Sequence, residues 1–210
     1  QPFLDSGAAE RVRIYFSPLY SGNQFHRLGG GGDTGPEANV FSPLDIVAVS
    51  MLDVHVPGDA ALKILGPLSQ SLTELLTDIP TDVALEAADE RFFDTGSAAD
   101  LLWHELANLP AVGRTISSKL MARKRPKLIP IFDSVIKDAL LPTQTNYWVR
   151  LRNELRNEEL VARLRQIRDE SAVGDMIPLI RILDVCVWMR NRKKSTEKVP
   201  FTPRGEFPHV

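Results

Sequence analysis

The sequence has few of the features that would place it in an oxidising compartment or in a membrane. Cys186 is the only cysteine among 210 residues, which excludes an intramolecular disulfide and a zinc ribbon. No apolar run approaches the ~18 residues that a membrane-spanning helix needs. The N-terminus also lacks the charged stretch followed by an apolar stretch that is typical of a signal peptide. We therefore expect a cytoplasmic protein with no membrane partner.

A large excess of charge of either sign is also missing. With 25 Lys and Arg against 27 Asp and Glu, the formal net charge is -2, which excludes a uniformly basic nucleic-acid coat. A site for a polyanion therefore has to be local. His55 and His104 have no further metal ligands at suitable spacing, so we expect no metal and no cofactor. The 43% of hydrophobic residues is enough to build a sizeable core.

Helical patterns dominate from residue 42 onward, and no period-two alternation is long enough for a sheet. Ser42 and Pro43 predict a helix start, followed by an apolar face that includes Leu44, Val47 and Ala48. Further helices are predicted within 59–65, 71–79, 81–93, 97–108, 119–124, 134–140, 146–155, 158–171 and 175–192. The sequence thus predicts an all-α fold, in which Cys186, Trp148 and Trp188 are core residues.

The two ends of the chain have a different composition. The motif GGGGDTGPEAN, from residue 29, predicts a mobile loop, and no lysine follows it at the spacing of a phosphate-binding P-loop. The last residues carry three prolines and no periodicity. We expect an N-terminal segment over 1–41, a helical domain over 42–190 and an extended tail over 191–210.

The segment LPAVGRTISSKLMARKRPKLIPIFD, residues 109–133, has six cations and no acidic residue before Asp133. LPAVG predicts a tight turn between two helices, in which Pro110 ends the first helix and Gly113 permits a positive φ. The backbone N–H groups that open the next helix suit a phosphate oxygen, and the cations can add phosphate contacts. A solvated helix face is the alternative interpretation of these cations.

This segment resembles the helix-hairpin-helix DNA glycosylase superfamily. Leu109, Pro110, Val112 and Gly113 match the family's Leu-Pro-Gly-Val-Gly hairpin, with Ala111 at the first glycine position. The spacing from Gly113 to Asp133 is the one associated with the family's catalytic aspartate. The resemblance implies a two-lobed helical bundle and DNA as the partner. The DNA-binding residues that it implies are Leu109, Pro110, Ala111, Val112, Gly113, Arg114, Thr115, Lys119 and Arg123.

The resemblance also implies a role for Asp133, which would stabilise the cationic sugar as the base departs or would activate a water. The nucleophilic lysine of the bifunctional members is replaced by Thr115, and Lys119 comes one turn later, so no lyase activity is expected. No cysteine cluster is present for an iron–sulfur centre. An ordinary helix N-cap is the alternative role of Asp133.

Aromatic and amide side chains near the N-terminus suggest a pocket for a flipped base, because rings accept its face and amides read its edge. The candidates are Tyr20, Asn23, Gln24, Phe25 and His26, and His55 lies near the expected DNA-facing turn. A packed N-terminal segment explains the same residues.

Two functions remain open. One is a monofunctional N-glycosylase for a damaged or modified base, and the other is a noncatalytic DNA-binding or interaction module. The segments YSGNQF and ARKRPKLIPIFD are also similar to a bacterial family of unknown function. We expect a monomer, and DNA binding would allow association with the nucleoid.

Overall fold

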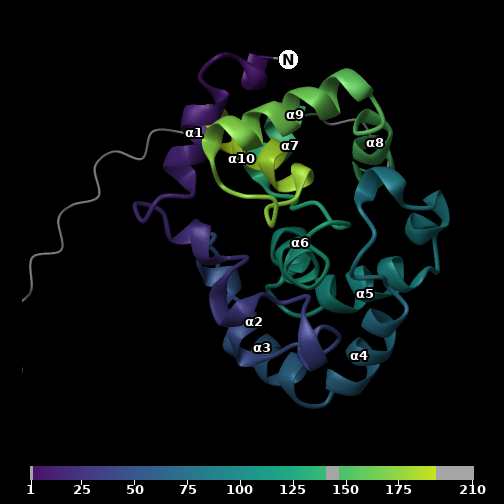
Figure 1. Cartoon of the computed structure of the whole chain (residues 1–210). Helices are drawn as coiled ribbons and strands as arrows, with labels where there is room; N and C mark the ends of the chain where they lie inside the picture. The colour runs from purple at the N-terminus through teal and green to yellow at the C-terminus, as the bar shows by residue number, and fades with distance from the viewer. Residues whose placement is uncertain (1, 141–146, 193–210) are drawn as a thin grey trace, which may run out of the picture.

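The computed structural model describes residues 2–140 and 147–192. Of the tail expected over 191–210, Asn191 ends the last described helix and Arg192 caps it, and residues 193–210 lie outside the described residues. Within these residues the protein contains α-helices and 3₁₀-helices and no strand, which confirms the predicted all-α fold (Figure 1). The α-helices are α1 (Ala8–Tyr15), α2 (Pro43–Ser50), α3 (Gly58–Leu65), α4 (Ser69–Thr77), α5 (Ala98–Ala107), α6 (Gly113–Lys124), α7 (Ser134–Leu140), α8 (Tyr147–Glu154), α9 (Glu158–Ser171) and α10 (Leu179–Asn191).

The helices form two groups. In one group, α10 packs against α1, α7 and α9. In the other group, α6 packs against α2 and α5, and α4 joins α5 to α3. Figure 1 shows the first group above the second, with α6 seen nearly end-on between them. Because α1 packs against α9 and α10, this first helix of the N-terminal segment belongs to the first group.

Helix α2 begins where the sequence predicted but buries a different face. Ser42 is its N-cap and Pro43 its first residue, and the backbone N–H of Ser42 donates to Asp45 Oδ2 at 2.9 Å in a capping box. Ala48 is buried as expected, whereas Leu44 and Val47 are each 46% exposed. The predicted buried face was wrong at these two positions, because Asp45 points inward.

The helix predicted over 81–93 was also wrong. Residues Leu85–Ala87 and Glu90–Phe93 form two short 3₁₀-helices with extended backbone between them. Tertiary hydrogen bonds hold this backbone open, since Leu85 N–H donates to the Lys127 carbonyl and Arg152 Nε donates to the Ala88 carbonyl. The helix predicted from 97 is confirmed as α5, where the Ser97 side chain accepts from the Asp100 N–H.

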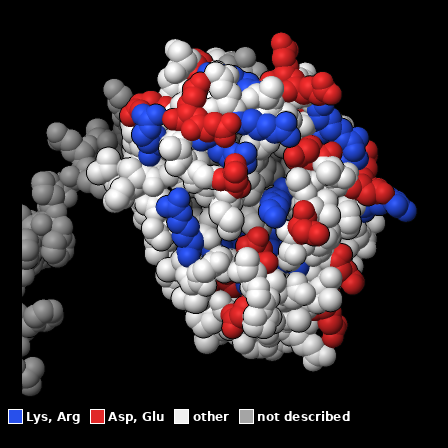
Figure 2. Space-filling view, in the orientation of Figure 1, with Lys and Arg blue, Asp and Glu red and all other residues white. Residues whose placement is uncertain are grey.

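One continuous set of buried apolar residues runs through both groups of helices. It includes Cys186, which is fully buried, and Trp148, as the sequence predicted. Trp188, also predicted as a core residue, is only half-buried and packs against the edge of this set. Figure 2 shows acidic and basic side chains interspersed over the face seen in Figure 1, so this face has no large patch of one sign.

Candidate functional site

Most of the cations in the segment 109–133 lie inside the protein. Lys119 is 4% exposed, while Arg123, Lys124 and Arg125 are each 1% exposed. Only Arg114 and Lys127 of the six lie on the surface. The acid that the segment itself lacks is supplied by α2, since Asp45 Oδ1 lies 3.1 Å from Arg123 Nε and Asp45 Oδ2 lies 2.6 Å from Lys124 Nζ.

Backbone carbonyls bind the remaining donors of these cations. Arg123 donates to the carbonyls of Phe25 and Leu28, each at 2.5 Å, and Lys124 donates to that of Glu37 at 3.0 Å. Arg125 donates to the carbonyls of Ala38, Ile79, Leu76 and Lys124. The cations at the end of α6 therefore bind the segment 25–39 to this helix.

This arrangement corrects two expectations. Arg123 does not fit the role of a DNA phosphate ligand, because its side chain is buried and each of its three nitrogens already donates to the protein. The glycine-rich segment is not a free loop, since it packs on α6. At Gly32 an added Cβ would lie 2.5 Å from the Arg123 carbonyl oxygen, so the close contact between the two backbones requires a glycine there.

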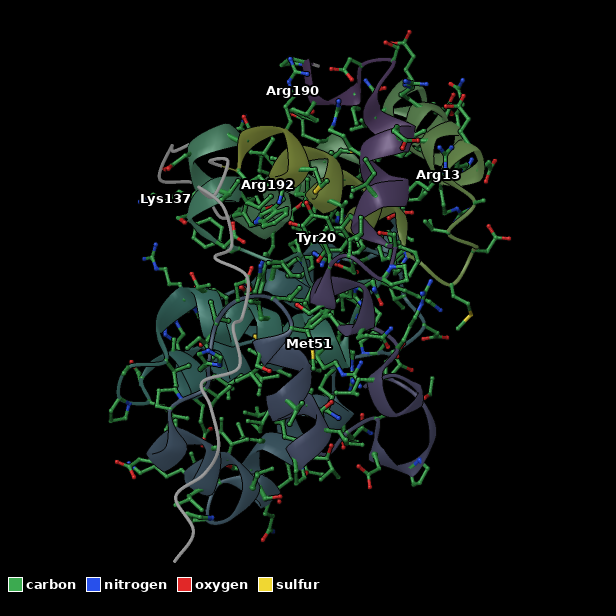
Figure 3. The ribbon with its side chains drawn as sticks, turned by 90° about the vertical axis from the view of Figure 1, so that its left-hand side faces the viewer. Arg13, Tyr20, Met51, Lys137, Arg190 and Arg192 are labelled. Carbon is green, nitrogen blue, oxygen red and sulfur yellow. The ribbon has the colours of Figure 1, made fainter. Side chains whose placement is uncertain are left out.

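A cavity of about 350 Å³ lies between the two groups of helices. Figure 3 shows Tyr20 and Met51 at the junction of the groups, with Arg192 above them. Residues of both groups, and of the segments beside them, form the walls of the cavity. These residues are Tyr15, Tyr20, Ser21, Gly22, Met51, Leu52, Asp53, Lys119, Ile131, Asp133, Arg181, Asp184, Val185, Trp188 and Arg192. Its volume falls within the range of small-molecule sites.

Asp133 caps a helix and also lines the cavity. Its Oδ1 accepts the Ile136 N–H at 3.0 Å, which caps α7, and its carboxyl group also lines the cavity. Ser118, which is fully buried on α6, fixes the preceding residue. The Ser118 hydroxyl donates to the Phe132 carbonyl at 3.1 Å and accepts the Phe132 N–H at 3.0 Å. Helix α6 thus positions Asp133 through the neighbouring backbone.

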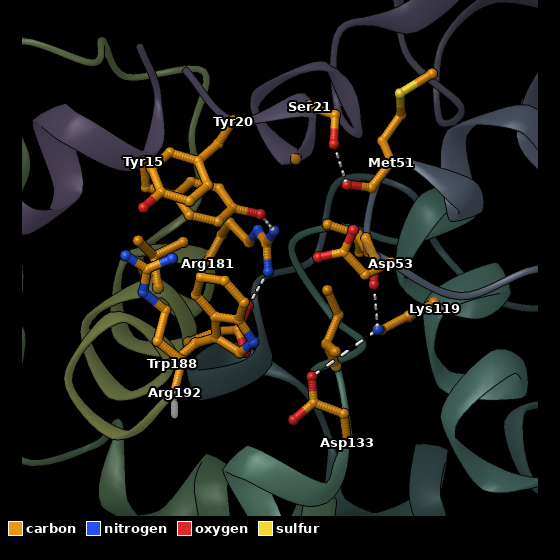
Figure 4. A pocket seen from close by; sticks show the side chains of 15 residues that line it. Tyr15, Tyr20, Ser21, Met51, Asp53, Lys119, Asp133, Arg181, Trp188 and Arg192 are labelled. Carbon is orange, nitrogen blue, oxygen red and sulfur yellow. Dashed lines mark hydrogen bonds and ion pairs between the residues drawn. The ribbon is translucent and has the colours of Figure 1, made fainter. Parts of the chain in front are cut away.

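Lys119 lies beside Asp133 in the cavity wall (Figure 4). Its Nζ donates to the Leu52 carbonyl at 3.0 Å and lies 3.9 Å from Asp133 Oδ2. Burial lowers the pKa of Lys119 to about 8, while the charges of Asp133 and Asp53 act in the opposite direction. The cavity therefore contains an amine that is easier to deprotonate than an ordinary lysine.

Asp53 adds a second carboxyl group on this side of the cavity. It follows α2 with a φ of 57°, a left-handed conformation that residues other than glycine rarely adopt. Such conformations persist where the surrounding structure over-determines them, and they cluster at functional sites. Here the turn carries the Leu52 carbonyl to Lys119 and leaves the Asp53 side chain on the cavity wall.

Aromatic rings and guanidinium groups form the other side of the cavity (Figure 4). Tyr15 and Tyr20 are stacked with centroids 5.9 Å apart, and Trp188 packs edge-on against both rings. The Tyr15 hydroxyl accepts from Arg181 Nη2 at 2.6 Å, and Arg181 Nη1 pairs with Asp184. Arg192 lies 4.9 Å from the Tyr20 centroid and 5.3 Å from the Trp188 centroid.

Comparison with known families assigns residues 8–191 to the family described as "Family of unknown function (DUF6308)". The chain belongs to this family. No curated protein and no solved structure matches the chain significantly. Within the described residues of this DUF6308 protein, no helix is long and apolar enough to cross a membrane.

The DUF6308 fold separates the residues predicted for a base pocket. Tyr20 lines the cavity. Asn23 and Phe25 are buried and do not line it, and Asn23 Nδ2 donates to the carbonyls of Ser17 and Tyr20. Gln24 and His55 are exposed and do not belong to the cavity wall. For Asn23 and Phe25, packing is therefore the role that the structure gives.

His26 lies in a second, much smaller cavity, which shares Arg181 and Asp184 with the first. Burial, aided by the charges of Arg181 and Arg123, holds the pKa of His26 well below its usual value. Its Nε2 is buried without a hydrogen-bond partner among the residues described. This imidazole is therefore neutral near pH 7 and lies behind the wall of the larger cavity.

The predicted hairpin residues connect α5 to α6. Leu109 and Val112 are buried anchors, whereas Pro110, Ala111, Gly113 and Arg114 are exposed and Thr115 is half-buried. Ala111 and Gly113 both have a φ of 59°, so the alanine adopts a conformation that usually favours glycine. The first turn of α6 contains no acidic residue.

Several cavity residues of this DUF6308 chain were not predicted from the sequence. Asp53, Arg181 and Arg192 come from separate parts of the sequence, and no local pattern distinguishes them from surface charges. Trp188 did carry a signal, because it lies one helical turn before Arg192 and at a helical spacing from Arg181. Arg181, Trp188 and Arg192 therefore share one face of α10, and this pattern could have indicated that the face is more polar than that of a buried helix.

Proposed function

We propose that the cavity binds a nucleobase attached to its sugar, and that the protein acts on DNA as a monofunctional N-glycosylase. One observation carries this proposal. The Asp133 carboxyl group, at the spacing that the hairpin resemblance implies, lies in the wall of a cavity that also has aromatic side chains. A planar, partly polar ring suits such walls, because rings can contact its faces while charged and hydroxyl groups contact its edges.

In the proposed reaction, the bond between the sugar C1′ and the base nitrogen breaks, and its electron pair leaves with the base. C1′ becomes cationic, and the negative charge of Asp133 stabilises it. A water oxygen then bonds to C1′ and gives up a proton to the departing base. Lys119 is the ion partner of Asp133 before the ligand enters, at 3.9 Å.

The proposed DNA contact is the exposed turn at the start of α6. Free N–H groups in the first turn of a helix favour an anion, and the first turn of α6 contains no acidic residue. Lys119 lies six residues after Gly113 on the same helix, so cavity and turn are separated by about 9 Å along the axis. This separation is short enough for one nucleotide strand to contact both.

Release of free base is the test of this proposal. The native protein and Asp133→Asn are incubated with duplex and single-stranded DNA carrying a panel of modified bases. Asp138→Asn, an exposed position on α7, serves as the matched control. We expect the native protein and the control to release a base, and Asp133→Asn to be slower by a factor of about 10² or more. A native protein that binds DNA but releases no base would support the noncatalytic module instead.

Lys119 favours a second candidate reaction. Its amine has a lowered pKa and lies in the same cavity, within reach of a sugar placed beside Asp133. The nitrogen would attack C1′, expel the base with its electron pair and lose a proton. The bond between C1′ and the sugar ring oxygen would then break, with the oxygen taking the electron pair and a proton, and the nitrogen lone pair would form the iminium. Loss of a proton from C2′ would then eliminate the 3′ phosphate. Borohydride would trap this iminium on the native protein and not on Lys119→Met. Absence of trapping during base release would exclude the second candidate.

A further inference from the structure

Arg192 is the last described residue of the cavity wall and follows the end of α10. Its guanidinium lies over the rings of Tyr20 and Trp188, and Trp188 is one helical turn earlier. Figure 4 shows Arg192, Tyr20 and Trp188 on the side of the cavity opposite Asp53, Lys119 and Asp133. The guanidinium is therefore held by ring contacts on the wall that faces the acidic groups.

The other cations of the cavity already have polar partners. Arg181 binds Asp184 and the Tyr15 hydroxyl, and Lys119 binds the Leu52 carbonyl. The Arg192 side chain has neither a hydrogen bond nor an ion pair with any residue in the ranges 2–140 and 147–192. A guanidinium stacks through its faces and donates hydrogen bonds from its edge, in the plane of the group. Among the described residues, the N–H groups of Arg192 are therefore unpaired, while its Cζ lies over the rings of Tyr20 and Trp188.

We propose that Arg192 binds the phosphate of the nucleotide whose base enters the cavity. The fork of N–H groups on a guanidinium matches two oxygens of a phosphate, and the cation–π contacts with Tyr20 and Trp188 reduce the entropy lost when the ligand binds. The inference rests on the proposed function, because it takes the ligand of the cavity to be a nucleoside. Under this inference the site binds phosphorylated nucleosides more tightly than nucleosides, and Arg192, on the wall opposite Asp133, provides the selectivity. The phosphate can belong to a free mononucleotide or to one nucleotide of a strand.

Calorimetric titration of the full chain tests this assignment. The ligands are a deoxynucleoside, its 5′-monophosphate and a short single strand containing the same nucleotide. The variants are Arg192→Ala and Arg192→Lys, and the control is Arg165→Ala. Arg165 is exposed on α9, is not part of the cavity wall, and gives the same change in net charge. Thermal unfolding of each variant verifies that the fold is retained.

We expect the Kd of the native protein for the monophosphate to be lower than its Kd for the nucleoside by a factor of about 10 or more. One charge-assisted hydrogen bond contributes enough binding free energy for such a factor. Arg192→Ala should remove this difference, and Arg192→Lys should restore only part of it, because an ammonium lacks the planar fork. Arg165→Ala should behave like the native protein. Binding of the monophosphate would identify a free nucleotide as a sufficient source, whereas binding of the strand alone would identify the strand.

Two results would overturn the inference. If Arg192→Ala weakens the nucleoside and the monophosphate equally, Arg192 supports the rings and does not bind phosphate, and the proposed function survives. If the native protein binds none of the three ligands, the proposed function fails and the inference fails with it. The nucleoside arm therefore distinguishes the two failures.

Discussion

Asp45→Ala should destabilise the protein severely, because Asp45 is the acid that balances the buried cations of α6. Its carboxylate lies 3.1 Å from Arg123 Nε and 2.6 Å from Lys124 Nζ, and the side chains of all three residues are at most 2% exposed. The same carboxylate accepts the Ser42 N–H at the start of α2. Removing it would leave two buried charges without their acid and α2 without its capping box.

The size of the effect follows from these contacts. Breaking a buried ion pair costs about 3–5 kcal/mol, and losing a helix cap costs about 1 kcal/mol. The sum, about 4–6 kcal/mol, is a large part of the 5–15 kcal/mol that stabilises a typical domain. For a chain of this size it corresponds to a fall in Tm of roughly 8–24 °C.

Thermal and urea unfolding, followed by circular dichroism, measure this loss against Asp82→Ala. Asp82 is an exposed loop residue with no ion pair among the residues described. Hydrogen exchange adds a local readout, since residues 25–39 are held by Arg123, Lys124 and Arg125 and should lose protection first in Asp45→Ala. If Asp45→Ala and Asp82→Ala differ by less than about 1 kcal/mol, the reasoning from burial and charge is refuted.

Three further predictions concern the cavity and the core. Gly22→Ala would place a Cβ 2.2 Å from the Tyr15 hydroxyl oxygen, so we expect the free energy of unfolding to fall by about 1–3 kcal/mol. Adding Tyr15→Phe to Gly22→Ala should restore part of this loss, and a double variant no more stable than Gly22→Ala would contradict this. Folding lowers the pKa of Lys119 from its ordinary value to about 8, so between pH 8 and 10.5 the unfolded chain binds more protons than the native protein. The free energy of unfolding of the native sequence, relative to that of Lys119→Met, should therefore rise with pH across this window. Urea unfolding in which this difference in stability stays constant or falls would disprove the prediction. Burial raises the pKa of Cys186 to about 12, so thiol reagents should modify it only after unfolding, and rapid modification of the native protein would show that α10 opens.

Local sequence signals predicted the helices well where capping chemistry marks their ends. Ser42-Pro43 and Ser97 mark the starts of α2 and α5 because their side chains or neighbours bind the first free N–H groups. The failure over 81–93 has a physical reason that no local pattern carries. Its backbone bonds to Lys127 and Arg152, which are distant in sequence.

The cation-rich segment was harder to interpret, because the partner of a charge is a tertiary property. Asp45 precedes Arg123 by 78 residues, and the carbonyls that bind Arg123 and Arg125 come from the segment 25–39, from α4 and from the residues next to them. Because no acidic residue lies near these cations in the sequence, we predicted an anionic ligand for them. Most of their positive charges are instead bound by a carboxylate and by backbone carbonyls of the protein itself. Asp133 and Tyr20 were predicted as site residues, and the fold places both in one cavity with Lys119.

Amide chemical-shift mapping with a short DNA strand is the most direct test of the central claim, that the cavity and the start of α6 together bind a nucleotide. The account predicts shifts in residues 20–22, 51–53, 113–119, 131–133 and 181–192, and smaller shifts in the cavity for Arg192→Ala. Shifts confined to α3, α4 or α9, or no shifts at low salt, would contradict it.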